Sequence, residues 1–149
     1  MSVPKAYQNY RRTVVETASR GQLILLLYDG LLRFLEQAKS ELADRRPKEA
    51  HFALIKAQNV LSELMASLDL DQGGQIAQNL LAVYEFMFMQ LVDANFRKSA
   101  EPIDGVVDLV RTLRVAWERA VNAETAERNR DALDGLTPPG ENGGFSMVS

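Results

Sequence analysis

The hydrophobic positions along this chain recur with the period of an α-helix, in four segments of similar length. Side chains that share one face of a helix are spaced three or four residues apart. This spacing predicts helices over residues 20–44, 47–70, 75–98 and 102–123, and strand-like alternation is not found in any segment. Short connections between helices of this length favour antiparallel neighbours. We therefore predict an all-α fold, an antiparallel four-helix bundle.

The ends of these helices are marked by capping and helix-breaking residues. Ser19 closes a Thr-Ala-Ser segment whose hydroxyls can cap the first helix. Pro47 disfavours helical geometry in the residue before it and suits the first turn of the second helix. Asp71-Gln72-Gly73-Gly74 reads as a turn, and Pro102 suits the start of the last helix. The stretch 135–144 is rich in glycine and proline and is expected to end any helix.

The same pattern divides the chain into three parts. Residues 1–19 are expected to form an N-terminal arm that carries basic side chains together with apolar ones. Residues 20–125 form the predicted bundle. From about residue 126 the periodicity fades, and residues 126–149 are expected to be a disordered tail because they cannot bury enough apolar surface to offset their chain entropy.

Several apolar residues miss the main face of their helix on a helical wheel drawn at about 100° per residue. The stretch NLLAVYEFMFMQLVDAN, residues 79–95, is apolar over a wider arc than a bundle helix needs, although Val92 still falls on its main face. Pairs spaced three or seven apart line up along one side of a helix. They could belong to a wide core, or they could form a groove for a partner. The residues outside the main faces are Leu25, Leu26, Leu32, Phe52, Ile55, Phe86, Met89 and, standing alone, Val115.

Composition and charge narrow the classes of function. The chain has 149 residues, of which 46% are hydrophobic, enough for one domain with a core. It has no cysteine, so disulfides, thiolate metal sites and cysteine nucleophiles are excluded. Residues 124–149 hold two basic and five acidic side chains, which accounts for the net charge of −3 and leaves the body neutral. Without a basic stripe we expect no nucleic-acid binding. Without a long apolar segment or a secretory signal we expect a soluble cytoplasmic protein with no membrane insertion.

The single histidine, His51, raises the possibility of a phosphotransfer bundle in which an imidazole accepts a phosphoryl group. That class has His-x-x-Lys-Gly at the nucleophile, whereas Leu54 and Ile55 occupy those positions here. The other interpretation is a solvated histidine in the first turns of a helix. Bundle metal sites need inward Glu-x-x-His pairs, and phosphate loops need a glycine-rich turn after a strand. Neither pattern occurs, so we predict no enzyme activity, no metal and no cofactor.

Four strings of sequence together resemble the FliS family of flagellar secretion chaperones. They occur in the family's order and spacing and cover most of the chain, from residue 10 to residue 121. The strings are YRRTVVETASRGQLILLLYDGLLRFLEQA (10–38), KAQNVLSEL (56–64), SLDLDQGGQIAQNLLAVYEFMFMQLVDAN (67–95) and VRTLRVAWERAV (110–121). One departure is Arg20, where the family usually has a proline. We expect this arginine to weaken the start of the first helix slightly and to touch no contact surface.

The resemblance implies a cytoplasmic, non-catalytic chaperone for flagellin, the filament subunit. Family members hold the disordered C-terminal segment of flagellin in apolar surface grooves, which prevents premature polymerisation, and escort it to the type III export apparatus. A 1:1 complex is implied, and a component of the export gate is a possible second partner. A free chain would be a monomer or a weak dimer, and a plain dimerising bundle is a further alternative to the chaperone.

The resemblance and the wheel together name the candidate contact residues. Tyr10 matches the family's arm tyrosine and is the expected lid over an empty groove. Asn59 and Asn95 match family asparagines that could bond client backbone or pair between helices. We expect Tyr28, Tyr84 and Trp117 to fill the core, with the tyrosine hydroxyls reaching the surface. The candidate groove residues are Leu25, Leu32, Phe52, Ile55, Phe86 and Met89.

Overall fold

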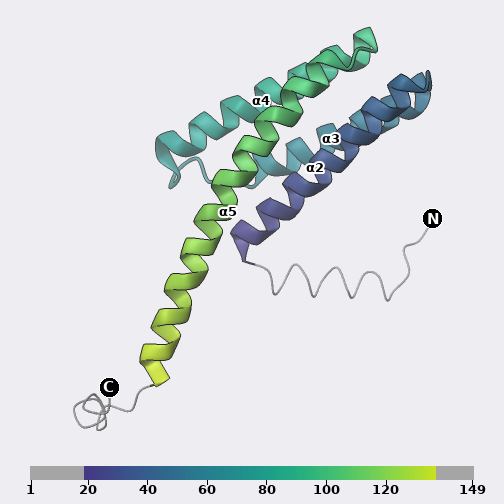
Figure 1. The fold of residues 1–149 in the computed structure, drawn as a ribbon. Helices are drawn as coiled ribbons and strands as arrows, with labels where there is room; N and C mark the ends of the chain where they lie inside the picture. Colours follow the sequence, from purple (N-terminus) through teal and green to yellow (C-terminus); the bar gives the residue numbers. More distant parts are fainter. Residues whose placement is uncertain (1–18, 137–149) are drawn as a thin grey trace, which may run out of the picture.

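The computed structural model describes residues 19–136, and within this part of the chain the backbone forms four helices and no strand. They are α2 (Arg20–Ala43), α3 (Pro47–Ala66), α4 (Gly74–Arg97) and α5 (Glu101–Leu136). Residues 44–46 and 98–100 form short connections, and the longer segment 67–73 joins α3 to α4. The neighbours in space are α2–α3, α3–α4, α4–α5 and α2–α5 (Figure 1). The helices therefore close a ring in which α2 lies diagonally opposite α4. The predicted four-helix all-α fold is confirmed.

The start of α2 is fixed by a capping box. The Ser19 hydroxyl accepts a hydrogen bond from the Gln22 amide at 3.1 Å, and the Gln22 side chain accepts one from the Ser19 amide at 3.1 Å. Two backbone N–H groups that would lack partners at the helix start are satisfied in this way. Pro47 occupies the first turn of α3, as its missing N–H allows.

The second helix ends at Ala66, earlier than the predicted Leu70. The Ser67 hydroxyl donates to the Leu64 carbonyl at 2.7 Å, which satisfies an acceptor at the helix end. The Asp69 carboxylate then accepts from the amides of Asp71 and Gln72, at 3.2 and 3.0 Å. Aspartate competes with helical hydrogen bonding in this way. The apolar period alone did not contain that information.

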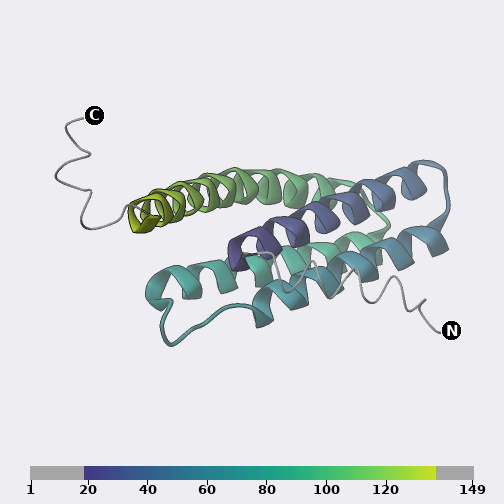
Figure 2. The ribbon, with the colours of Figure 1, turned by 90° about the horizontal axis from the view of Figure 1, so that it is seen from below.

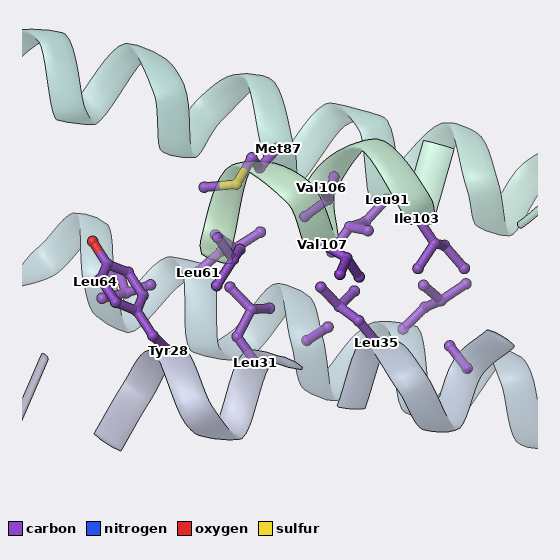
Figure 3. Close-up of a cluster of buried hydrophobic side chains, with 14 of the residues drawn as sticks. Tyr28, Leu31, Leu35, Leu61, Leu64, Met87, Leu91, Ile103, Val106 and Val107 are labelled. Atoms are coloured by element: carbon purple, nitrogen blue, oxygen red, sulfur yellow. The ribbon is translucent and has the colours of Figure 1, made fainter. Parts of the chain in front are cut away.

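The core lies between the four helices and receives side chains from each of them (Figure 3). Tyr28, Leu31 and Leu35 come from α2, and the other helices meet them from the opposite sides. Burying an aliphatic or aromatic side chain of this size contributes about 1.5–3 kcal/mol to stability. The other core members labelled in Figure 3 are Leu61, Leu64, Met87, Leu91, Ile103, Val106 and Val107.

The contact between α2 and α5 is close at one end and charged along its length. A Cβ added to Gly21 would lie 2.4 Å from Val121 Cγ2, so only glycine permits this approach of the two helices. Arg114 on α5 donates to both carboxylate oxygens of Asp29 on α2, at 2.6 and 3.3 Å. Lys39 and Asp104 form a second ion pair at 2.7 Å. These contacts fix the register of α5 against α2.

The fourth helix continues to Leu136, so the predicted helix end at residue 123 was wrong. Beyond Val121 it projects past the start of α2 and leaves the bundle (Figures 1 and 2). This segment is rich in alanine, glutamate and arginine, which favour helix without tertiary contacts. Arg128 and Glu124 add a pair one turn apart at 3.7 Å. The apolar period therefore stopped where packing stopped, not where the helix stopped.

The division of the chain into arm, bundle and tail stays a prediction. Residues 1–18 and 137–149 lie outside the described residues, and they include the predicted lid residue Tyr10 and most of the predicted tail. Within residues 19–136, no helix is long and apolar enough to cross a membrane.

Candidate functional site

The large apolar side chains that remain exposed gather on two neighbouring helices. Helices α3 and α4 carry seven of them, and Phe96 is the most exposed, at 87%. Soluble chains rarely leave a large apolar patch uncovered unless it serves a partner. These seven residues are Phe52 and Ile55 on α3, and Ile76, Phe86, Met89, Val92 and Phe96 on α4.

Two hollows lie in line between α3 and α4, and we call them together the α3–α4 groove. The first has a volume of about 520 Å³ and the second about 320 Å³. The α3 side chains on the wall are spaced three or four apart, as one helical face requires. The first hollow is lined by His51, Ile55, Gln58, Val92, Asn95, Phe96 and Lys98, and the second by Ser62, Met65, Glu85, Phe88 and Met89.

One end of the groove carries a chain of hydrogen bonds between α3 and the end of α4. Lys98 Nζ donates to Asn95 Oδ1, and Asn95 Nδ2 lies 2.8 Å from His51 Nδ1. Lysine can only donate, so the asparagine oxygen must face it and the amide nitrogen must face the imidazole. His51 Nδ1 is then the acceptor, and the proton of the neutral ring is on Nε2. The hydrogen-bonding capacity left at this end is dominated by donors.

The other end of the groove has the opposite character. Glu85 is an exposed carboxylate on α4, and it lines the second hollow together with Ser62. Within residues 19–136 no ion pair involves Glu85. A carboxylate only accepts hydrogen bonds. The groove therefore runs from a donor end at Lys98 to an acceptor end at Glu85, with apolar side chains between them.

Three of the contact residues predicted from the sequence lie on the wall of the α3–α4 groove. Ile55, Met89 and Asn95 line the hollows. Phe52, Asn59 and Phe86 are exposed on the same two helices but line neither hollow. Asn95 pairs with His51 between helices, which is one of the two roles open to it from the sequence.

The two α2 candidates are not part of this groove. Leu25 and Leu32 are half-buried, and Leu32 packs against the core. Within residues 19–136, the α2 candidates therefore do not line the hollows between α3 and α4. A helical wheel assigns each residue an angle about its own axis, but it does not show how neighbouring helices are turned toward each other.

Sequence reasoning missed several groove residues. Val92 was expected in the core but is exposed, and Phe96 was not singled out. A signal was present, because Phe96 follows Val92 by four residues and Met89 by seven. Met65 and Phe88, which the helical wheel did not set apart, are half-buried and line the second hollow while also packing on the core. Side chains at the edge of a core face can serve both surfaces.

Comparison with known proteins identifies the family of this chain. The family model described as "Flagellar protein FliS" matches residues 3–124, most of the chain. The chain belongs to the FliS family.

Curated relatives agree over nearly their whole length. Flagellar secretion chaperone FliS of Bacillus subtilis (strain 168) is 30% identical over 129 residues, 87% of this chain and 96% of that protein. The FliS protein of Escherichia coli (strain K12) is 32% identical, with 81% of this chain and 93% of that protein covered. That of Salmonella typhimurium (strain LT2) is 36% identical, with 77% and 87% covered. This chain is thus similar, over most of its length, to proteins named flagellar secretion chaperones.

This FliS chain also has an apolar cavity of about 350 Å³ at the end of the bundle where α5 projects. Trp117, Tyr84 and Ile76 contribute to its walls. Arg20, which stands where the family usually has proline, lines the same cavity and donates to the carbonyl of Ser67 at the end of α3. A long side chain at the first turn of α2 thus reaches the end of the neighbouring helix α3, and the expectation that Arg20 touches no partner contact surface stays a prediction.

Proposed function

We propose that the α3–α4 groove binds amphipathic helical segments from the C-terminal part of flagellin. The observation that carries the proposal is the row of exposed apolar side chains on α3 and α4, aligned with two hollows. The chain belongs to the FliS family, and its relatives are named flagellar secretion chaperones. Both facts support a client from the flagellum.

The shape of the groove suits a helix as its ligand. Apolar anchors at helical spacing in a client can enter hollows arranged between two parallel walls, a common mode of peptide recognition. Each buried anchor of Leu or Phe size contributes about 1.5–3 kcal/mol. A client that orders on binding loses chain entropy, so several anchors are required before binding is tight. Methionines such as Met65 and Met89 adapt to an imperfect client surface.

The consequence for the client is that its assembly surface is covered. We propose a 1:1 complex in the cytoplasm that prevents flagellin from polymerising and presents it to the export apparatus, with an export-gate component as a further partner. Without client, the free chain is expected to be a monomer or a weak dimer. Tyr10 and the N-terminal arm are proposed to cover the empty groove.

The first experiment is calorimetric titration of the full chain with the C-terminal segment of the same organism's flagellin, paired with circular dichroism of the mixture. Tight 1:1 binding with a negative heat-capacity change and a gain of helicity would support an apolar-groove chaperone. An absence of both heat and gained helicity, with both components intact, would reject the flagellin proposal. The exposed apolar row would then point to self-association, which light scattering at several concentrations would reveal.

A further inference from the structure

The two ends of the α3–α4 groove differ in hydrogen-bonding character, and this difference sets a direction for a bound helix. We propose that a client helix lies in the groove parallel to α4, with its N-terminal end at Glu85 and its C-terminal end at His51, Asn95 and Lys98. This inference rests on the proposed function and adds to it the orientation of the bound segment.

At the donor end, two acceptor atoms already have partners. Asn95 Oδ1 is occupied by Lys98, and His51 Nδ1 is occupied by Asn95 Nδ2. Most groups that remain to bind a ligand are N–H donors: two on the Lys98 ammonium, one on the Asn95 amide and one on His51 Nε2, beside the Gln58 amide, which can both donate and accept. The last four carbonyls of an α-helix lack partners within the helix and accept hydrogen bonds. A helix C-terminus is therefore the complementary ligand for this end.

The acceptor end gives the same direction independently. Glu85 lines the second hollow and has no ion-pair partner within residues 19–136. The first four N–H groups of an α-helix need acceptors, and a carboxylate beside them is favoured by the helix dipole. A helix N-terminus is the matching ligand, so both ends of the groove favour one and the same orientation.

The helices of the bundle do not impose a direction of their own. At the donor end, the positive start of α3 meets the negative end of α4, so their dipoles oppose each other. The side chains at the two ends therefore decide the orientation. Glu85 and Lys98 are separated along α4 by about 20 Å at about 1.5 Å per residue. The bound client helix should accordingly have about 13 residues between its two capped ends.

The direction can be read with paramagnetic labels, since the chain contains no cysteine. Lys48→Cys and Glu63→Cys introduce single sites at exposed positions of α3, the first near the donor end and the second near the acceptor end. Each labelled full-length chain is mixed with the isotope-labelled C-terminal segment of flagellin, and line broadening is mapped along the segment. We expect the label at 48 to broaden the C-terminal end of one client helix and the label at 63 to broaden its N-terminal end.

The reversed pattern would overturn the inference and leave the proposed function intact. Binding by calorimetry with no broadening from either label would also overturn it, because the client would lie elsewhere on the chain. No binding at all would reject the proposed function together with the orientation.

Charge-neutral variants test the role assigned to each end. Lys98→Gln and Glu85→Gln are each expected to weaken binding roughly two- to fivefold at low salt, as for charges at helix ends. The matched controls are Arg111→Gln on α5 and Glu63→Gln on α3, both exposed and outside the hollows. Equal losses in test and control variants would overturn the assignment of these two side chains.

Discussion

The hydroxyls of Tyr28 and Tyr84 lie 2.7 Å apart inside the core and join α2 to α4 across the diagonal of the bundle. Both rings are buried, as the sequence predicts, but the expected exit of the hydroxyls to the surface is wrong. A buried hydroxyl needs a partner, and each tyrosine supplies the partner of the other. Within residues 19–136 no buried side-chain polar atom of this structure lacks a hydrogen bond.

The first prediction concerns this pair. Tyr28→Phe leaves the Tyr84 hydroxyl buried without a partner and should lower the free energy of unfolding by about 1–3 kcal/mol. Tyr84→Phe should cost less, because Trp117 lies beside the Tyr28 hydroxyl. The double Phe variant removes both hydroxyls and should cost clearly less than the sum of the two single changes. Urea unfolding of the four proteins in the cycle measures the coupling. Additive losses would show that the hydroxyls do not interact in solution.

The second prediction concerns alkaline pH. Burial, and then the hydrogen bond with Tyr84, raise the pKa of Tyr28, and burial raises the pKa of Tyr84. An unfolded tyrosine loses its proton near pH 10, so above that pH the native state binds more protons than the unfolded state. Stability should then fall as pH rises, by up to about 1.4 kcal/mol per pH unit for each tyrosine. Unfolding measured from pH 8 to 11 should show a shallower fall in the double Phe variant, and an unchanged slope would contradict this.

The third prediction separates groove residues from other exposed apolar residues. Ile55→Asp removes an anchor from the first hollow and should weaken binding of the flagellin segment about tenfold or more. Phe86→Asp should weaken binding less, because Phe86 lines neither hollow. Titration calorimetry measures both, and circular dichroism checks that helicity is kept.

The matched control for these variants is Leu26→Asp, an exposed apolar position on α2. We expect it to bind like the unaltered chain. A variant at Ile55 that unfolds would assign that residue to the core, and equal weakening at positions 26 and 55 would remove the distinction between groove and surface.

The features that the sequence predicts are local, and those that it does not predict depend on how the helices pack. Periodicity and caps predicted the fold and all four helix starts to within a residue, because both are local: the Ser19 box and Pro47 act within one turn. The far end of α5 escaped the pattern because it is helical without packing. The groove was predicted in part, since Ile55 and Met89 stand out on a single wheel. Phe96 and the His51–Asn95 pair depend on how α3 and α4 face each other, which no single-helix pattern contains.

The fourth prediction compares two helical glycines. Gly21→Ala would place a Cβ 2.4 Å from Val121 Cγ2, so α2 and α5 must separate, at a cost of about 1–3 kcal/mol. Gly105→Ala meets nothing within 4 Å and should stabilise α5 by about 0.5–1 kcal/mol, since alanine favours helix. Denaturant unfolding of both variants checks the opposite signs. Stabilisation by both would mean that the α2–α5 contact yields without cost.

The fifth prediction concerns the projecting end of α5. Deleting residues 127–149 removes the last turns of the helix, whose side chains are exposed from Glu127 to Gly135. Because residues 127–135 bury no side chain in the bundle, the melting temperature should change by less than about 2 °C. Flagellin binding should also persist, since the α3–α4 groove is untouched. Thermal melts and calorimetry of the shortened chain test both statements. A drop of several degrees would show that these residues dock on the bundle, and the cavity beside Trp117 and Ile76 would then be the place to look for them.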